Sequence, residues 1–128
     1  MATTKIVIAG CRNYHNYDEA KTYLDDCLAD IKSKNDIIIL SGGANGADKL
    51  GERYALEKNF RVELFLPEWD KYGKSAGPKR NKLMAQACDY VICFWDGESS
   101  GTRSMIAYAK EYNKPLFIKM LSIDYYHK

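Results

Sequence analysis

The chain has 128 residues, 46% of them hydrophobic and 28% charged, which is typical of one compact domain. Nineteen basic against seventeen acidic side chains leave a net charge of +2, which does not favour a general DNA-binding or membrane-surface protein. No apolar stretch approaches the roughly 18 residues that span a bilayer, and the first residues lack the apolar core of a signal peptide. We therefore expect a single domain over residues 1–128, located in the cytoplasm and not in a membrane.

The cysteine and histidine positions do not form a metal-binding pattern. The four cysteines include no CxxC pair, and the two histidines, His15 and His127, stand far apart in the sequence. We therefore expect no zinc or iron–sulfur site and no bound metal. In a cytosolic protein the thiols stay reduced, and we interpret three of them as small core residues. These are Cys27, Cys88 and Cys93.

Short apolar runs alternate with segments of helical spacing from the start of the chain. The run 5–9 precedes residues 17–33, where apolar positions recur every three or four residues, as in a helix. Asn16 followed by Glu19 resembles a capping box at the start of that helix. Residues 36–40 are apolar after Asp36, as expected of a strand that helices cover on both faces.

The same alternation continues in the second half of the chain. A helix begins at Ala47 and is expected to end near Asn59. The next strand alternates apolar and polar residues, which is typical of an edge. Pro78 suits the first turn of the third helix, and Ser100 is a candidate cap for the fourth. The predicted strands are 5–9, 36–40, 61–66, 90–95 and 116–118, and the later helices are 78–87 and 101–112.

This order of elements predicts an α/β fold, a single Rossmann-like three-layer domain. Five strands alternating with four helices imply a parallel sheet with helices on both faces. Because the most apolar strands should be central, we expect the strand order 3-2-1-4-5, with the reversal between strands 1 and 4. The longest connection, 67–77, has eleven residues without predicted structure, which indicates a functional loop. Alternatively, its Trp69 and Tyr72 cover the core.

Ligands of open parallel sheets bind beyond the carboxyl ends of the strands, near the point where the strand order reverses. Four segments should meet there: 10–12, 41–48, 77–81 and 96–102. Trp69 joins them from the long loop. The candidate ligand-binding residues are Gly10, Cys11, Arg12, Ser41, Gly42, Gly43, Gly46, Asp48, Trp69, Pro78, Arg80, Asn81, Asp96, Gly97, Ser100, Gly101 and Thr102.

The glycines of segment 41–48 predict a phosphate cradle. Gly42 and Gly43 allow close approach of a ligand, and Gly46 precedes a helix whose N–H groups attract anions. A tight strand-to-helix turn would need the same glycines, so both interpretations stay open. The segment is neither a Walker A motif nor a dinucleotide GxGxxG motif, since no Gly-Lys-Ser/Thr follows and the glycines come after strand 2.

Charged and aromatic residues complete the candidate site. Arg12 and Arg80 are expected to bind phosphate or carboxylate. Asp48 and Asp96 can accept hydrogen bonds from ribose, although Asp48 can instead orient its own loop. Trp69 and Tyr72 offer flat surfaces for a base. Cys11 and His15 suggest a nucleophile and base, but no third group orients them, so we interpret Cys11 as a small residue in a crowded turn.

Five segments of the sequence also carry a family resemblance. They are Ile8-Ala9-Gly10-Cys11-Arg12, residues 41–48, Pro67-Glu68-Trp69-Asp70, Gly77-Pro78-Lys79-Arg80-Asn81 and residues 94–102. In this order, over about residues 5–118, they resemble the YspA/YpsA-related branch of the SLOG superfamily. The resemblance implies a Rossmann-like domain, found in bacteria and phages, that binds a nucleotide-like ligand and forms homodimers or larger homo-oligomers. The family pattern commonly has Ser at the position of Cys11.

A comparison with the Lonely Guy phosphoribohydrolases of that superfamily bears on catalysis. Arg80-Asn81-Lys82-Leu83-Met84 is similar to their Arg-Lys-x-x-Met pattern, so Arg80 matches their catalytic Arg. Ser104 stands at the position of their catalytic Glu. The resemblance therefore favours a nucleotide-binding sensor or sequestering module, without a cofactor, over a nucleotide N-glycosidase. A single-stranded nucleic-acid binder like DprA is a weaker alternative because of the near-neutral charge.

Overall fold

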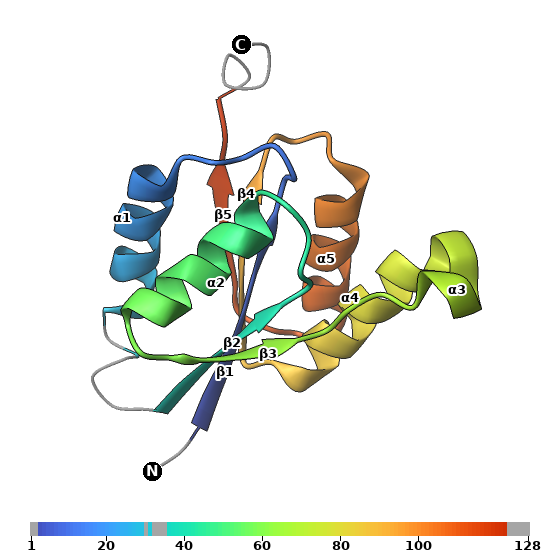
Figure 1. Cartoon of the computed structure of the whole chain (residues 1–128), viewed down its shortest axis with the longest axis horizontal. Coiled ribbons are helices and arrows are strands. Elements are labelled where there is room, and N and C mark those ends of the chain that lie inside the picture. Colours follow the sequence, from blue (N-terminus) through green and yellow to red (C-terminus); the bar gives the residue numbers. More distant parts are fainter. Residues whose placement is uncertain (1–2, 30, 32–35, 123–128) are drawn as a thin grey trace.

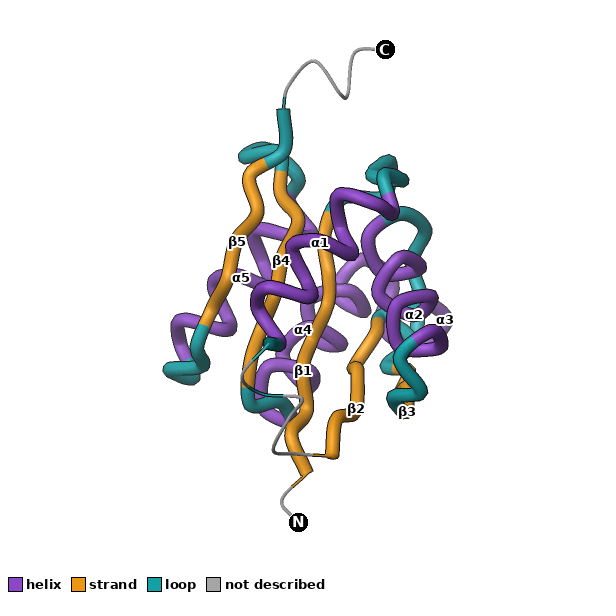
Figure 2. Tube along the Cα trace, turned by 90° about the vertical axis from the view of Figure 1, so that its left-hand side faces the viewer, coloured by secondary structure: helices purple, strands orange, loops and turns teal. Residues whose placement is uncertain are grey.

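Five parallel strands form one sheet with helices packed on both of its faces (Figure 1). The computed structural model describes residues 3–29, 31 and 36–122. The strands are β1 (Thr3–Gly10), β2 (Asp36–Ser41), β3 (Arg61–Leu64), β4 (Tyr90–Trp95) and β5 (Leu116–Met120), and they lie in the order β3-β2-β1-β4-β5 (Figure 2). This confirms the predicted fold class, strand order and reversal between strands 1 and 4.

Each face of the sheet has its own apolar core. Successive side chains of a strand point to opposite faces. Ile6 and Ile8 of β1 therefore face α1 (Tyr17–Leu28) and α2 (Ala47–Glu57), whereas Val7 faces α4 (Ala76–Ala87) and α5 (Ser100–Glu111). Burial on both sides explains why residues 6–9 of β1, 37–40 of β2 and 90–95 of β4 are apolar. Cys88 and Cys93 are fully buried, as expected, but Cys27 is only half-buried.

The start of α1 was predicted well, but its end was not. The Asn16 side chain accepts a hydrogen bond from the Glu19 N–H at 3.1 Å, while the Glu19 carboxylate accepts from the Tyr14 hydroxyl at 2.7 Å. The helix ends at Leu28 rather than at residue 33. Ile31 belongs to a turn but still packs against the same core, so the apolar spacing continued past the helix. Residues 32 and 33 lie outside the described residues.

The connection 67–77 contains helical structure, contrary to the prediction. It forms α3 (Trp69–Tyr72) and a 3-10 turn, η1 (Gly73–Ser75), and α4 then begins at Ala76 instead of Pro78. A single helical turn is too short to show apolar periodicity. Trp69 is 50% exposed and Tyr72 38%, which does not fit the interpretation that they cover the core.

Smaller differences concern the ends of several elements, such as β3 and α5. β3 ends at Leu64 instead of residue 66. The N-cap of α5 is Ser99, and the predicted cap, Ser100, is the first helical residue. α2 ends at Glu57, and Asn59 adopts the left-handed conformation that ends many helices, as predicted. Among the described residues, no helix is both long and apolar enough to cross a membrane.

Candidate functional site

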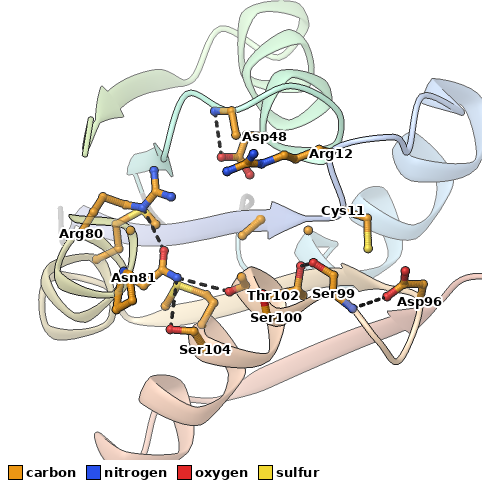
Figure 3. Close-up of a pocket in the computed structure, with 18 of the residues that line it drawn as sticks. Cys11, Arg12, Asp48, Arg80, Asn81, Asp96, Ser99, Ser100, Thr102 and Ser104 are labelled. Atoms are coloured by element: carbon orange, nitrogen blue, oxygen red, sulfur yellow. Dashed lines mark hydrogen bonds between the residues drawn. The ribbon is translucent and has the colours of Figure 1, made fainter. Parts of the chain in front are cut away.

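A cavity of about 680 Å³ opens at the carboxyl ends of β1 and β4, between the first turns of α4 and α5 (Figure 3). We call it the main cavity, and its size is typical of a small-molecule site. Twelve of the predicted residues line it: Gly10, Cys11, Arg12, Asp48, Trp69, Pro78, Arg80, Asn81, Asp96, Ser100, Gly101 and Thr102. Ala44, Gly77 and Ser99 also line it, and they lie in the segments that were expected to meet there. The prediction missed Ala9, Asn13, Lys74, Met84, Ser104 and Met105.

Arg80 reaches from α4 across to the loop that follows β2. Its Nη1 donates to the Gly42 carbonyl at 2.7 Å and to the Phe65 carbonyl at 3.4 Å, and its Nε donates to Asn81 Oδ1 at 2.9 Å. Nη2 has no hydrogen-bond partner among the residues that the structure describes. Partial burial lowers the pKa of Arg80, in spite of the nearby Asp48 carboxylate. The guanidinium is thus held in place with one amino group left for a ligand.

Asp48 places a buried carboxyl group beside this arginine. It lies in the first turn of α2, is only 5% exposed, and accepts a hydrogen bond from the Ala44 N–H at 3.1 Å. Burial raises the pKa of Asp48 to about 6, although the Ala44 N–H, Arg80 and Arg12 act in the opposite direction. Figure 3 shows the Arg12 side chain directed toward this carboxyl group. Asp48 therefore both orients its own loop and lines the main cavity.

The loop after β4 forms the opposite wall. Asp96 accepts hydrogen bonds from the Glu98 and Ser99 N–H groups, both at 2.8 Å. Burial raises the pKa of Asp96, but these two N–H groups and the Cys11 thiol outweigh it, so the pKa lies below its ordinary value. Thr102 Oγ1 contacts Ser99 Oγ at 3.4 Å. Asp96 therefore organises the turn that leads into α5.

Asn81 connects the first turns of α4 and α5. Its side chain is 6% exposed, and Nδ2 donates to the Gly101 carbonyl at 3.3 Å and to Ser104 Oγ at 3.4 Å (Figure 3). Because its Oδ1 also accepts from Arg80, this amide links the arginine to the start of α5. Asn81 thus positions two walls of the cavity relative to each other.

Five predicted site residues do not line the main cavity: Ser41, Gly42, Gly43, Gly46 and Gly97. Ser41 is fully buried, and its hydroxyl donates to Glu52 at 2.6 Å and accepts from the Gly43 N–H at 3.1 Å. Gly46 has a φ of +76°, and a Cβ there would collide with the carbonyl oxygens of Cys11 and Arg12. These contacts fit the tight-turn interpretation of segment 41–48, and the phosphate-cradle interpretation stays a prediction.

The backbone of Cys11 connects the loop after β1 to β4 and to the start of α2. Its N–H donates to the Phe94 carbonyl at 3.0 Å, and its carbonyl accepts from the Ala47 N–H at 3.1 Å. The side chain is 3% exposed. This geometry agrees with a small residue in a crowded turn, and His15 is not among the residues that line the main cavity. Within the described ranges, no group of His, Cys, Asp and Glu side chains could hold a metal ion.

The fold and the cavity at the carboxyl edge of the sheet define a Rossmann-like α/β domain. Residues 4–72 match the YspA, cpYpsA-related SLOG family (YAcAr), and the chain belongs to this family. It is 32% identical over 120 residues to the gene 61 protein of Mycobacterium phage D29, an alignment that covers 88% of this chain and 93% of the phage protein.

Three solved structures share the fold. DprA from Streptococcus pneumoniae superposes with a TM-score of 0.71 at 19% identity, covering 95% of this chain and 52% of DprA, so the chain spans about half of that protein. DprA from Helicobacter pylori, described as binding single-stranded DNA, superposes with a TM-score of 0.70 at 23% identity, covering 94% of this chain and 67% of that protein. TM1055 superposes with a TM-score of 0.62 at 21% identity, covering 91% of this chain and 72% of TM1055. At these identities the likeness shows the fold.

Proposed function

We propose that this domain binds a nucleotide or a nucleotide-derived small molecule in the main cavity and acts as a sensor or a sequestering module. The observation that carries the proposal is the position of Arg80. Its guanidinium lines the cavity, is held by two backbone carbonyls, and keeps Nη2 without a partner among the described residues. A fixed, partly buried guanidinium is well suited to bind a phosphate through charge-assisted hydrogen bonds.

Other groups around the cavity suit the remaining parts of such a ligand. The start of α5, a helix of twelve residues, brings N–H groups and the Ser100 hydroxyl toward the same space as Arg80. The Asp48 carboxyl group can accept hydrogen bonds from ribose hydroxyls. Trp69 is half exposed at the rim and offers a flat surface on which a base can stack.

A nucleotide N-glycosidase is the second candidate, and the buried carboxyl group of Asp48 favours it. Cleavage of an N-glycosidic bond needs a carboxylate near the cationic centre that develops on the sugar, and Ser104 cannot supply one. Asp48 lines the same cavity, and burial raises its pKa to about 6, a suitable range for an acid–base group. The binding module remains the primary proposal because Ser104 stands where the phosphoribohydrolases have their catalytic Glu.

Titration calorimetry with AMP, GMP, CMP, UMP and a dT oligonucleotide tests the proposal. We expect at least one monophosphate to bind, and Arg80→Gln to weaken that binding about tenfold or more, because a charge-assisted hydrogen bond is lost. The matched control is Lys82→Gln, which removes an exposed charge from the same helix. Equal affinities of wild type and Arg80→Gln would contradict the proposed site, and binding of the oligonucleotide alone would contradict the proposed ligand class.

The same samples distinguish the two candidate functions. Chromatography of the monophosphates after incubation at high protein concentration measures release of free base. We expect no release by the wild type. Release that is abolished by Asp48→Asn would instead assign the hydrolase, with Asp48 as its carboxyl group.

A further inference from the structure

A second cavity, of about 440 Å³, is lined by the loop that follows β1 and by the start of α2. Its lining consists of Arg12, Asn13, His15, Asn45, Gly46 and Lys49, which we call the basic subsite. This lining has basic and amide side chains but no carboxylate. The main cavity, by contrast, is lined by carboxylates of Asp48 and Asp96 as well as by basic side chains. The two cavities therefore favour different parts of a ligand.

Arg12 and Asn13 line both cavities. Arg12 is exposed, and its guanidinium lies beside Asp48 of the main cavity in Figure 3. One ligand can therefore extend from the main cavity into the basic subsite past these two side chains. Each cavity alone has the volume of a small-molecule site.

Lys49 is the side chain of the basic subsite best placed to bind an added anion. Its Nζ lies 3.4 Å from Glu52 Oε1, but the lysine side chain is 55% exposed. An ion pair that is so exposed contributes little to stability, so the ammonium group can turn to a ligand at small cost. The other carboxylate oxygen of Glu52 is already engaged by the Ser41 hydroxyl.

We infer that the ligand of this domain carries two phosphate groups, and that the second phosphate occupies the basic subsite between Arg12 and Lys49. This inference rests on the proposed function and specifies its ligand class. The second phosphate belongs either to a terminal diphosphate or to a linkage that joins the nucleotide to a second unit. Both present the same chemistry to the subsite, which is a negative charge adjacent to the phosphate held by Arg80.

The test compares inorganic pyrophosphate with orthophosphate, and ADP, GDP, CDP and UDP with their monophosphates, by calorimetry in the presence of EDTA. We expect the compounds with two phosphates to bind about tenfold or more tightly than those with one. Lys49→Gln should remove most of this advantage and leave monophosphate affinity within about twofold. Lys82→Gln, which changes an exposed lysine outside both cavities, should leave both affinities unchanged. Diadenosine diphosphate then distinguishes the two kinds of diphosphate. Tighter binding than ADP would indicate a linking diphosphate, and weaker binding a terminal one.

The results distinguish a failure of the basic subsite from a failure of the proposed nucleotide binding. Pyrophosphate binding that depends on Lys49, without binding of any nucleotide, would support the subsite and contradict the nucleotide ligand. Binding of monophosphates and diphosphates with equal affinity would overturn the inference and leave the main cavity as the whole site. Lys49→Gln without effect on pyrophosphate would also overturn it. A dT oligonucleotide that binds more tightly than ADP with the same dependence on Lys49 would assign the subsite to a nucleic-acid backbone instead.

Discussion

Replacing Asp48 by Asn should change how the stability of the domain depends on pH. The pKa of this carboxyl group rises from an ordinary 3.8 to about 6 in the folded protein, chiefly because it is buried. The folded state therefore holds a proton that the unfolded state has already lost between about pH 4 and pH 6. Stability is highest below that range and falls as pH rises through it.

The size of this effect follows from the two pKa values. They differ by about two, and each pKa unit corresponds to about 1.4 kcal/mol, so ionised Asp48 lowers the free energy of unfolding by about 3 kcal/mol above pH 7. Asn keeps an oxygen that can accept the hydrogen bond from the Ala44 N–H but carries no charge. We expect Asp48→Asn to remove most of this loss of stability between pH 4 and pH 7.

Urea unfolding of wild type and Asp48→Asn at pH 4 and pH 7 measures the effect. The free energy of unfolding of Asp48→Asn, minus that of the wild type, should increase by about 2 to 3 kcal/mol from pH 4 to pH 7. Asp26→Asn, which changes an exposed carboxylate on α1, is the matched control and should give no such change. If the difference between wild type and Asp48→Asn is the same at both pH values, burial does not raise the pKa of Asp48 and the reasoning is refuted.

Three further predictions concern other parts of the site. Gly46→Val should lower the free energy of unfolding, measured in urea, by about 2 kcal/mol or more, because Gly46 has a positive φ and a Cβ there would collide with two carbonyl oxygens. Gly101→Ala is the control and should leave this free energy unchanged, because a Cβ there would have open space around it. Trp69→Ala should weaken nucleotide binding by about 1–3 kcal/mol in calorimetry with little change in Tm; an unchanged Kd would exclude stacking. Ser104→Glu should produce release of free base from monophosphates, measured by chromatography, if this helix aligns with the hydrolases; a gain abolished by Arg80→Gln would verify the alignment.

The order of the strands could be predicted because the strands buried on both faces differ in sequence from those at the edges of the sheet. Strands covered on both faces need a continuous apolar run, and residues 37–40 of β2 and 90–95 of β4 form such runs. Parallel strands also bring the loops that follow them to one edge, so the positions of Cys11 and Asp96 in one cavity followed from the topology. The residues predicted from the positions of the strand ends therefore lie together at one cavity, and their role in binding stays a prediction.

Other parts of the site depend on contacts between residues distant in sequence. The glycines after β2 suggested a ligand, but Gly46 makes room for the backbone of Cys11 and Arg12, a partner that local sequence does not reveal. Lys74 lines the cavity from a 3-10 turn, and such a turn is too short to leave a periodic pattern in the sequence. Asn81 lines the cavity, as expected of a candidate ligand-binding residue, but its hydrogen bonds to Arg80 and to the start of α5 could not be predicted from the sequence.

The parallel sheet also determines where a label or a fused domain would stand. β1 begins at the edge of the sheet that holds the amino ends of the strands, opposite the main cavity. β5 ends at the edge that holds their carboxyl ends, where the cavity lies (Figure 1). Leu121 donates its N–H to the Trp95 carbonyl at 2.8 Å, and the Met120 methyl group lies 3.6 Å from where a Cβ on Gly97 would be. Attachment before Thr3 leaves the cavity open to solvent, so a surface-immobilised sample is best held there. A fluorophore placed after Leu121 would instead be adjacent to the loop after β4, which forms one wall of the main cavity.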